Sequence, residues 1–218
     1  MTALVLLDVD GTLQDSQAVI VETVRVAFAE SDMTPPLRET ILRTVGLSLP
    51  RMIEALAPGA SDERMTALVA SYRLAFAKSV AEAQPPLFAG VAEGLDRMEA
   101  AGLALGLATG KSGRGVRAFL ADQGWERRFA TAQHADLNPS KPHPSMIRNA
   151  LAEADAPAAR CVMVGDTAFD MEMARAAGVG AIGVSYGYHD AETLRRAGAD
   201  AVADSFLGAV DAVLERLA

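Results

Sequence analysis

Two aspartates stand two residues apart just after a short apolar run near the amino terminus. Asp8 and Asp10 follow the apolar residues 4–7 and precede Gly11. Two carboxylates this close repel one another, so the pair favours a bound divalent cation or a division of acid and base roles. A simple turn is the alternative, whereas a calcium loop is excluded because its further acidic ligands are absent. Gly11 permits a sharp turn, and its amide can approach an anion.

A second acidic pair follows another apolar run. Asp166 comes directly after residues 161–164, and Asp170 lies four residues later, about one helical turn away. Either Asp166 or Thr167 could instead serve only as a helix cap. Two acidic clusters at the ends of separate strands nevertheless favour a metal site built between the two loops.

Two further loops carry groups that suit an anionic ligand. Thr109 and Gly110 follow the apolar run 103–108 and supply a hydroxyl and backbone amides where a helix begins, which favours anion binding. A turn capped by Ser112 explains the same residues equally well. Lys141 stands in Ser-Lys-Pro-His-Pro, where the prolines restrict the backbone and suit a lysine that must hold one position. A solvated surface charge is the alternative.

The elements that must position these residues alternate between strand and helix. Short apolar runs at 4–7, 103–108, 161–164, 179–184 and 199–202 are typical of buried parallel strands. Helical spacing occupies 91–101, 113–123, 144–154, 169–177 and 206–217 between and after them. This order predicts an α/β fold, a three-layer, doubly wound parallel sheet, in which ligands bind beyond the carboxyl ends of the strands.

The segment from about residue 16 to 85 interrupts this alternation. It shows four amphipathic helical patterns, at 18–30, 37–44, 49–57 and 62–83, and no convincing strand. We therefore expect a catalytic α/β core made of residues 1–15 and 86–218, with residues 16–85 inserted as a helical cap domain.

Composition limits the classes of partner. The 218 residues include 20 Lys+Arg against 28 Asp+Glu, a net charge of −8, which argues against nucleic acid and anionic membranes as partners. The single cysteine, Cys161, excludes an internal disulfide. Without a signal peptide or a long apolar run, a cytoplasmic location is expected.

The four loops, in this order and spacing, closely resemble the haloacid dehalogenase superfamily of phosphotransferases. The matching segments are Asp-Val-Asp-Gly-Thr-Leu at 8–13, Thr-Gly-Lys at 109–111, Lys-Pro at 141–142 and Gly-Asp-Thr at 165–167 followed by Asp170. The α/β core looks like the Rossmann-like core of that superfamily, and the inserted helices look like its α-helical cap. Within it, the chain is most similar to phosphoglycolate phosphatases.

The resemblance implies a role for each loop in a Mg²⁺-dependent phosphatase. Asp8 would be the nucleophile that forms an aspartyl-phosphate, and Asp10 the general acid and base, its backbone carbonyl touching the metal. Lys141 would offset negative charge. The resemblance further implies a phosphate site of Gly11, Thr109, Gly110 and Lys141, and a metal site of Asp8, Asp10, Asp166 and Asp170.

The cap is expected to choose the substrate, a small phosphorylated metabolite, in a monomer or homodimer. Gly46 lies where relatives place a loop that faces the crevice, and Arg43 or Arg51 could reach a second anionic group, although surface arginines are as easily explained. His189 is a loop residue near the site.

Three alternatives to a phosphatase stay open, namely a phosphosugar mutase, an inorganic pyrophosphatase and a non-catalytic binding protein. A phosphosugar mutase of the beta-phosphoglucomutase type and an inorganic pyrophosphatase would use the same core. A dehalogenase is disfavoured because it has no use for an acid at Asp10. A non-catalytic binding protein would be expected to have lost one of the key residues, and Asp8, Asp10, Lys141 and Asp166 are all present.

Overall fold

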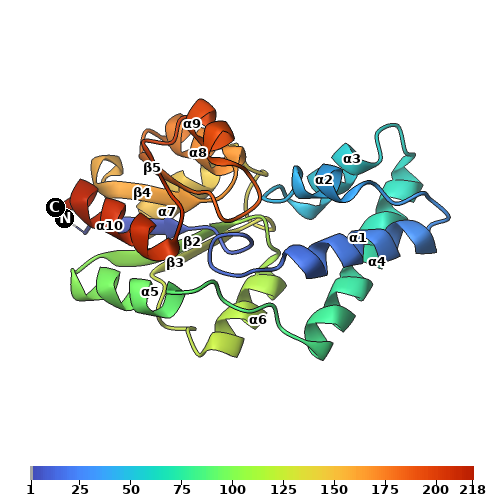
Figure 1. Cartoon of the computed structure of the whole chain (residues 1–218), viewed down its shortest axis with the longest axis horizontal. Helices are drawn as coiled ribbons and strands as arrows, with labels where there is room; N and C mark the ends of the chain where they lie inside the picture. The colour runs from blue at the N-terminus through green and yellow to red at the C-terminus, as the bar shows by residue number, and fades with distance from the viewer. Residues whose placement is uncertain (1) are drawn as a thin grey trace.

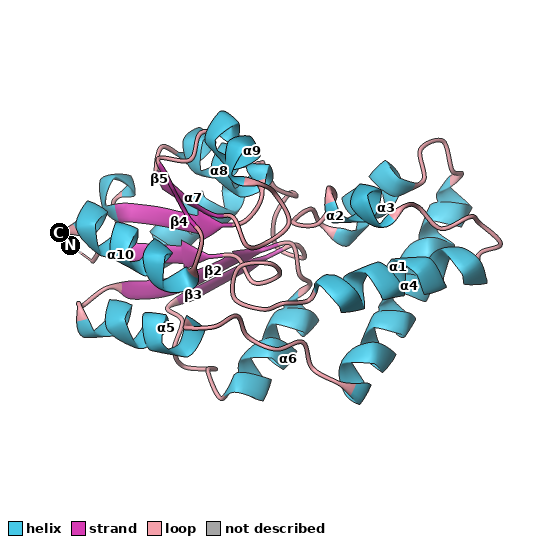
Figure 2. Ribbon diagram, viewed as in Figure 1, coloured by secondary structure: helices cyan, strands magenta, loops and turns pink. Residues whose placement is uncertain are grey.

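One sheet of parallel strands forms the centre of the molecule. The structure, a computed structural model, describes residues 2–218. Within them six strands lie in the order β3-β2-β1-β4-β5-β6, with every pairing parallel (Figures 1 and 2). Their bounds are β1 Leu4–Leu7, β2 Ala104–Thr109, β3 Thr131–His134, β4 Cys161–Gly165, β5 Gly180–Val184 and β6 Ala201–Ala203.

Helices cover both faces of the sheet, because successive side chains of a strand point to opposite sides. In β1, Val5 and Leu7 pack in one apolar cluster with α5, α6 and α10, whereas Leu4 and Leu6 pack in a second cluster with α7, α8 and α9. The predicted three-layer, doubly wound α/β fold is therefore confirmed. The helices are α5 Val91–Ala100, α6 Gly113–Gln123, α7 Ser145–Glu153, α8 Ala168–Ala177, α9 Ala191–Ala197 and α10 Phe206–Leu217, with a short 3-10 turn at Ala158–Arg160.

Four helices from the amino-terminal half lie beyond one end of the sheet (Figure 1). They are α1 Gln17–Glu30, α2 Arg38–Leu42, α3 Leu49–Leu56 and α4 Asp62–Glu82. They bury an apolar cluster of their own around Val24, Phe28 and Ile53. The predicted division into a core of 1–15 and 86–218 and a cap of 16–85 stays a prediction, which this separate cluster supports. Among the described residues, no helix is both long and apolar enough to span a membrane.

The two chain segments that join these helices to the core run side by side. Gln14 forms an antiparallel bridge with Leu87, and the Phe88 amide donates to the Leu13 carbonyl at 3.0 Å. The Gln14 side chain also donates to the Pro85 carbonyl at 2.9 Å. The two crossings are thus tied together next to the predicted boundaries of the helical insertion.

The order of the strands places a crevice at the carboxyl end of β1. The chain runs from β1 outward through β2 to β3, then returns to the other side of β1 for β4, β5 and β6. Loops after β1, β2 and β4 therefore diverge around one point, the position where open α/β sheets bind ligands. All the sequence motifs that suggested chemistry follow these three strands or, like Lys141, lie in the loop before α7.

Two elements were not expected from the sequence, β3 and α9. β3 reads Thr-Ala-Gln-His, so it lacks the apolar run used to recognise the other strands. Its polar side chains are satisfied locally, since the Thr131 hydroxyl donates to Glu153 and the Gln133 amide donates to Thr131 at 3.1 Å. α9 has only seven residues, and the Asp190 side chain caps it by accepting from the Thr193 amide at 2.8 Å.

The packing predicts a large difference between two leucine truncations of the same size. Leu6 is fully buried in β1, and Leu74 on α4 is 74% exposed. Leu6→Ala should lower the free energy of unfolding by about 2–5 kcal/mol because it leaves a cavity, whereas Leu74→Ala should change it by less than about 0.5 kcal/mol. Urea unfolding followed by circular dichroism checks both, and equal losses would contradict the assigned core.

Candidate active site

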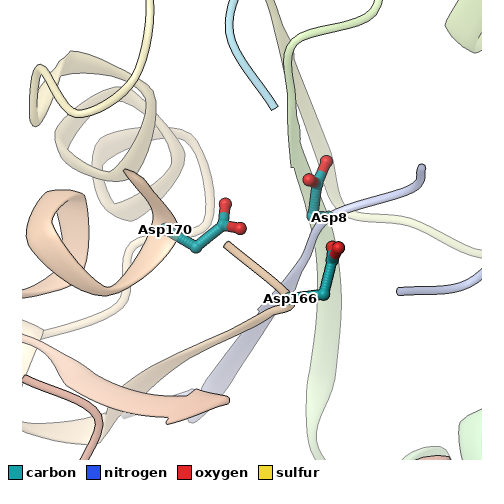
Figure 3. Close-up of side chains that lie close together, drawn as sticks. All are labelled: Asp8, Asp166 and Asp170. Atoms are coloured by element: carbon teal, nitrogen blue, oxygen red, sulfur yellow. The ribbon is translucent and has the colours of Figure 1, made fainter. Parts of the chain in front are cut away.

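Three aspartates from different elements meet in the interior at the carboxyl end of the sheet. Asp8 follows β1, Asp166 follows β4, and Asp170 lies in the first turn of α8 (Figure 3). Each is at most 1% exposed. One carboxylate oxygen from each lies within 4.8 Å of the other two. The structure thus brings together three of the residues predicted to form a metal site.

A buried lysine balances part of this negative charge. The Lys141 ammonium lies 2.6 Å from Asp170 Oδ1 and 3.0 Å from Asp8 Oδ2, and its side chain is fully buried. Burial alone would lower the pKa of Lys141, but Asp170 and Asp8 together raise it above its usual range. Lys141 is therefore a fixed cation between two carboxylates, and the surface-charge alternative is wrong.

Local hydrogen bonds hold Asp166 and Asp170 in place. Asp170 Oδ2 accepts from the Thr167 amide at 3.1 Å and hydroxyl at 2.7 Å, and Thr167 in turn caps α8, so the two residues form a capping box. Asp166 accepts from the Thr12 hydroxyl at 2.8 Å and from the Tyr188 amide at 2.9 Å. Asp170 therefore belongs both to the capping box of α8 and to the buried charge cluster, because its Oδ2 accepts from Thr167 and its Oδ1 accepts from Lys141. A part in the helix cap and a metal-binding role are compatible here.

Without a bound cation, the buried and mutually repelling carboxylates of Asp8, Asp166 and Asp170 destabilise the folded protein. Burial, joined by repulsion from Asp170 and Asp10, raises the pKa of Asp8 to about 6 against the lowering effect of Lys141. Burial also raises the pKa of Asp166 well above its ordinary value, with added repulsion from Asp8 and Asp170. Buried carboxylates that repel one another are relieved by a cation.

The donor set fits a small divalent cation. Mg²⁺ prefers carboxylate and carbonyl oxygens, and two ligands on opposite sides of it lie about 4.2 Å apart. The three aspartates offer oxygens within a similar span. In addition, Asp8 Oδ2 is buried and makes no hydrogen bond of normal geometry, although Lys141 is near it. The residues present therefore suit the predicted Mg²⁺, with Asp8, Asp166 and Asp170 as its side-chain ligands.

Asp10 points away from this cluster and is held separately. Its Oδ1 lies 2.8 Å from the Lys111 ammonium and accepts from the Ser16 hydroxyl. The Ser16 hydroxyl is in turn 3.1 Å from the Tyr188 hydroxyl. Both anchors act on one oxygen, so Oδ2 is left without a protein hydrogen bond among the described residues. The Asp10 side chain thus lies outside the group of three aspartates, which agrees with a role for its backbone, not its carboxylate, at the metal.

Two glycines let other backbone segments come close to the site. Gly11 has φ +85°, and a Cβ there would lie 2.2 Å from Asp166 Oδ2. A Cβ on Gly110 would lie 2.6 Å from the Leu47 carbonyl oxygen and 2.7 Å from that of Gly46. Thr109, at the end of β2, is 1% exposed. Larger residues at either glycine would push apart the loops that surround the aspartates.

The cap loop meets the core where the sequence predicted it would. Gly46 lies against Thr167 as well as Gly110, and the Ser48 amide donates to the Ser140 hydroxyl at 2.8 Å. Arg43, near this loop, is exposed, so its predicted contact with substrate stays a prediction.

The two remaining candidates are explained by local contacts. Arg51 is exposed and pairs with Glu54 at 2.7 Å. His189 has a structural role, because its Nδ1 accepts from the Ala168 amide at the start of α8 at 2.9 Å. Burial lowers the pKa of this imidazole, which suits an acceptor nitrogen.

Sequence reasoning missed four residues that hold the site, namely Thr12, Ser16, Lys111 and Tyr188. Lys111 stood within the Thr-Gly-Lys motif and received no role, although its place at the end of β2 is a signal. Thr12 and Ser16 belong to the loop that follows Asp10. For Tyr188 there was no local signal, because only the fold brings the loop after β5 beside the loop after β1.

Comparison with known proteins gives the family. The chain belongs to the haloacid dehalogenase-like hydrolase family, whose model matches residues 5–184. The expected superfamily and the expected enzyme class, a phosphatase hydrolase, are thereby confirmed.

Individual relatives span nearly the whole chain. It is 37% identical over 222 residues to "Probable phosphatase IndB" of Dickeya dadantii (strain 3937), covering 99% of this chain and 96% of that protein. It is 32% identical over 185 residues to a phosphoglycolate phosphatase of Xanthomonas campestris pv. campestris (strain 8004), covering 84% and 83%. A crystal structure of a "predicted phosphatase" from Clostridium acetobutylicum superposes with a TM-score of 0.88 at 24% identity, covering 99% of each chain, which shows the shared fold.

The buried carboxylates predict a pH-dependent stability. Because the folded-state pKa of Asp8 is raised from 3.8 to about 6, its contribution is most favourable below pH 4 and is lost as the pH rises through 6. Without metal, raising the pH from 4.5 to 7.5 should cost the wild type on the order of 2 kcal/mol more than Asp8→Asn. Urea unfolding of both proteins in chelator measures this. Parallel pH profiles would contradict the raised pKa.

Proposed function

We propose that the protein is a Mg²⁺-dependent phosphomonoester hydrolase that acts on a small phosphorylated metabolite, like the phosphoglycolate phosphatases. The observation that carries this proposal is the arrangement of Asp8 against Lys141, with Asp166 and Asp170 beside it and Asp10 held apart. The names of the relatives from Dickeya dadantii and Xanthomonas campestris support the same class of reaction.

Asp8 is the nucleophile in this proposal. Its carboxylate attacks phosphorus, forming an Asp8 oxygen–phosphorus bond while the bond to the leaving oxygen breaks. Lys141 steadies the carboxylate before attack and offsets charge on the phosphoryl group. The Thr109 hydroxyl and the Gly110 amide bind phosphoryl oxygens. The Gly11 amide, also predicted for this role, already donates to the Gln14 carbonyl at 2.9 Å and does not take part. Mg²⁺, held by Asp8, Asp166, Asp170 and the Asp10 carbonyl, supplies neutralising charge for the transferring group.

Asp10 is the general acid for the leaving alkoxide and then the general base for the attacking water. Its Oδ1 is fixed by Lys111 and Ser16, so Oδ2 delivers a proton to the departing alkoxide. The same oxygen then takes a proton from the water that attacks the phosphoryl group on Asp8, which releases phosphate and restores the free carboxylate. A group that acts first as acid and then as base must keep one position, and two anchors on the opposite oxygen provide that.

The cap shields the reaction from bulk water. Its loop at Gly46 and Leu47 lies directly on Gly110, and Phe76 of α4 lies over Lys111. A site enclosed in this way suits a small ester and not a phosphoprotein.

A screen of small phosphate esters tests the proposal. Phosphoglycolate, hexose phosphates and pyrophosphate are incubated with the purified protein and Mg²⁺, and phosphate release is measured. We expect release from at least one monoester without any bisphosphate primer. Chelation should reduce the rate by at least about 100-fold, since it removes the main neutralising charge, and added Mg²⁺ should restore it.

Two outcomes would contradict the proposal. Primer-dependent isomerisation of a hexose phosphate with little phosphate release would indicate the mutase alternative. Full activity after exhaustive chelation would reject the metal site.

A further inference from the structure

Lys111 is a buried cation with an incomplete set of partners. Its side chain is 9% exposed, and its ammonium lies 2.8 Å from Asp10 Oδ1. Asp10 is the one carboxylate within ion-pairing distance among the described residues. An ammonium group has three donors, so the ion pair with one carboxylate oxygen leaves Lys111 with donors that no protein acceptor among the described residues occupies.

Lys141, at the same end of the sheet, has a more complete set of partners. Its ammonium lies between two carboxylates, Asp170 at 2.6 Å and Asp8 at 3.0 Å. The two lysines thus differ by one anionic partner. Lys111 therefore has room for one more anionic partner, which a ligand can supply.

The cap completes the surroundings of Lys111 with aromatic rings. The Phe76 ring centroid lies 5.4 Å from the Lys111 ammonium. Phe76 stacks on Tyr72, one turn earlier on α4, with centroids 5.8 Å apart. These rings place an apolar wall beside the cation, which lowers the local dielectric constant and strengthens the attraction of the ammonium for an anion bound there.

The other cations near the crevice are less suited to this task. Lys141 already has two carboxylate partners, Arg43 is exposed, and Arg51 is exposed and paired with Glu54. Lys111, by contrast, sits beside Asp10, the residue that would protonate the leaving oxygen. A group bound by Lys111 therefore belongs to the leaving part of the substrate and not to its phosphoryl group.

We propose that Lys111 is a specificity-determining residue that binds an anionic oxygen group, such as a carboxylate, on the leaving part of the substrate. The inference rests on the proposed function and adds to it a residue and a chemical requirement. Esters whose leaving alcohol carries a negative charge would complete the partners of Lys111, whereas esters with a neutral alcohol would give it no second anionic partner.

A matched pair of esters tests this. Phosphoglycolate and 2-hydroxyethyl phosphate differ in having a carboxylate or a hydroxymethyl group, and both release a primary alcohol. We expect the wild type to prefer phosphoglycolate by about 10- to 100-fold in kcat/KM, the value of one charge-assisted contact. Lys111→Met should bring this ratio close to one, mainly by raising KM for phosphoglycolate. The control Lys78→Met, an exposed lysine on α4, should leave the ratio unchanged.

The ratio separates substrate binding from other effects of the mutation. Partial unfolding or a displaced Asp10 would lower the rates on both esters together and leave the preference intact. That result, or a wild type without preference, would overturn the inference while the proposed function stands. p-Nitrophenyl phosphate serves as a third substrate. If the wild type with Mg²⁺ hydrolyses neither these three esters nor the hexose phosphates of the screen, the proposed function is overturned and this inference with it.

Discussion

The structure depends on how the buried charge around Asp8 is balanced. Three aspartates share one interior space, and ionised carboxylates are costly there unless a cation faces them. Lys141 supplies one positive charge between Asp8 and Asp170. That leaves an excess of negative charge, which suits Mg²⁺. Burial and the same excess of negative charge raise the pKa of Asp8 and Asp166. The cluster therefore lowers the stability of the metal-free protein, and it provides a place where a cation and a phosphoryl group can bind.

The fold serves this cluster by bringing distant segments to one point. Asp8 and Asp166 end neighbouring strands, and the capping box of α8 sets Asp170 one turn further on. Asp10, only two residues from Asp8, is turned to a different set of partners, Lys111 and Ser16. Two carboxylates with separate surroundings can take separate roles, one as nucleophile and one as acid and base. Phe76 of α4 contacts Lys111 in this second set, so the inserted helices border the carboxylate that is proposed as acid and base.

Much of this arrangement could be predicted from the sequence, for a physical reason. Buried parallel strands such as β1 and β4 are continuous apolar runs that end in polar residues, so Asp8 and Asp166 were recognisable as neighbours at one edge. β3 was not predicted because its side chains are polar. Their partners, such as Glu153 for Thr131, come from another element, and no local sequence pattern reveals them. The roles of Tyr188 and Ser16 were not predicted for a similar reason, since their contact joins residues that are 172 positions apart in the sequence. Lys111 was visible as a residue but not as a partner of Asp10.

The most direct test of the account is to find where the phosphoryl group is carried. The enzyme, turning over a small phosphate ester with Mg²⁺, is quenched in acid and reduced with borohydride, which converts an aspartyl-phosphate to homoserine, and the peptides are analysed by mass spectrometry. The account predicts homoserine at position 8 in the wild type, and neither homoserine nor turnover in Asp8→Asn. Phosphate release without modification of Asp8, or homoserine at position 10 instead, would contradict it.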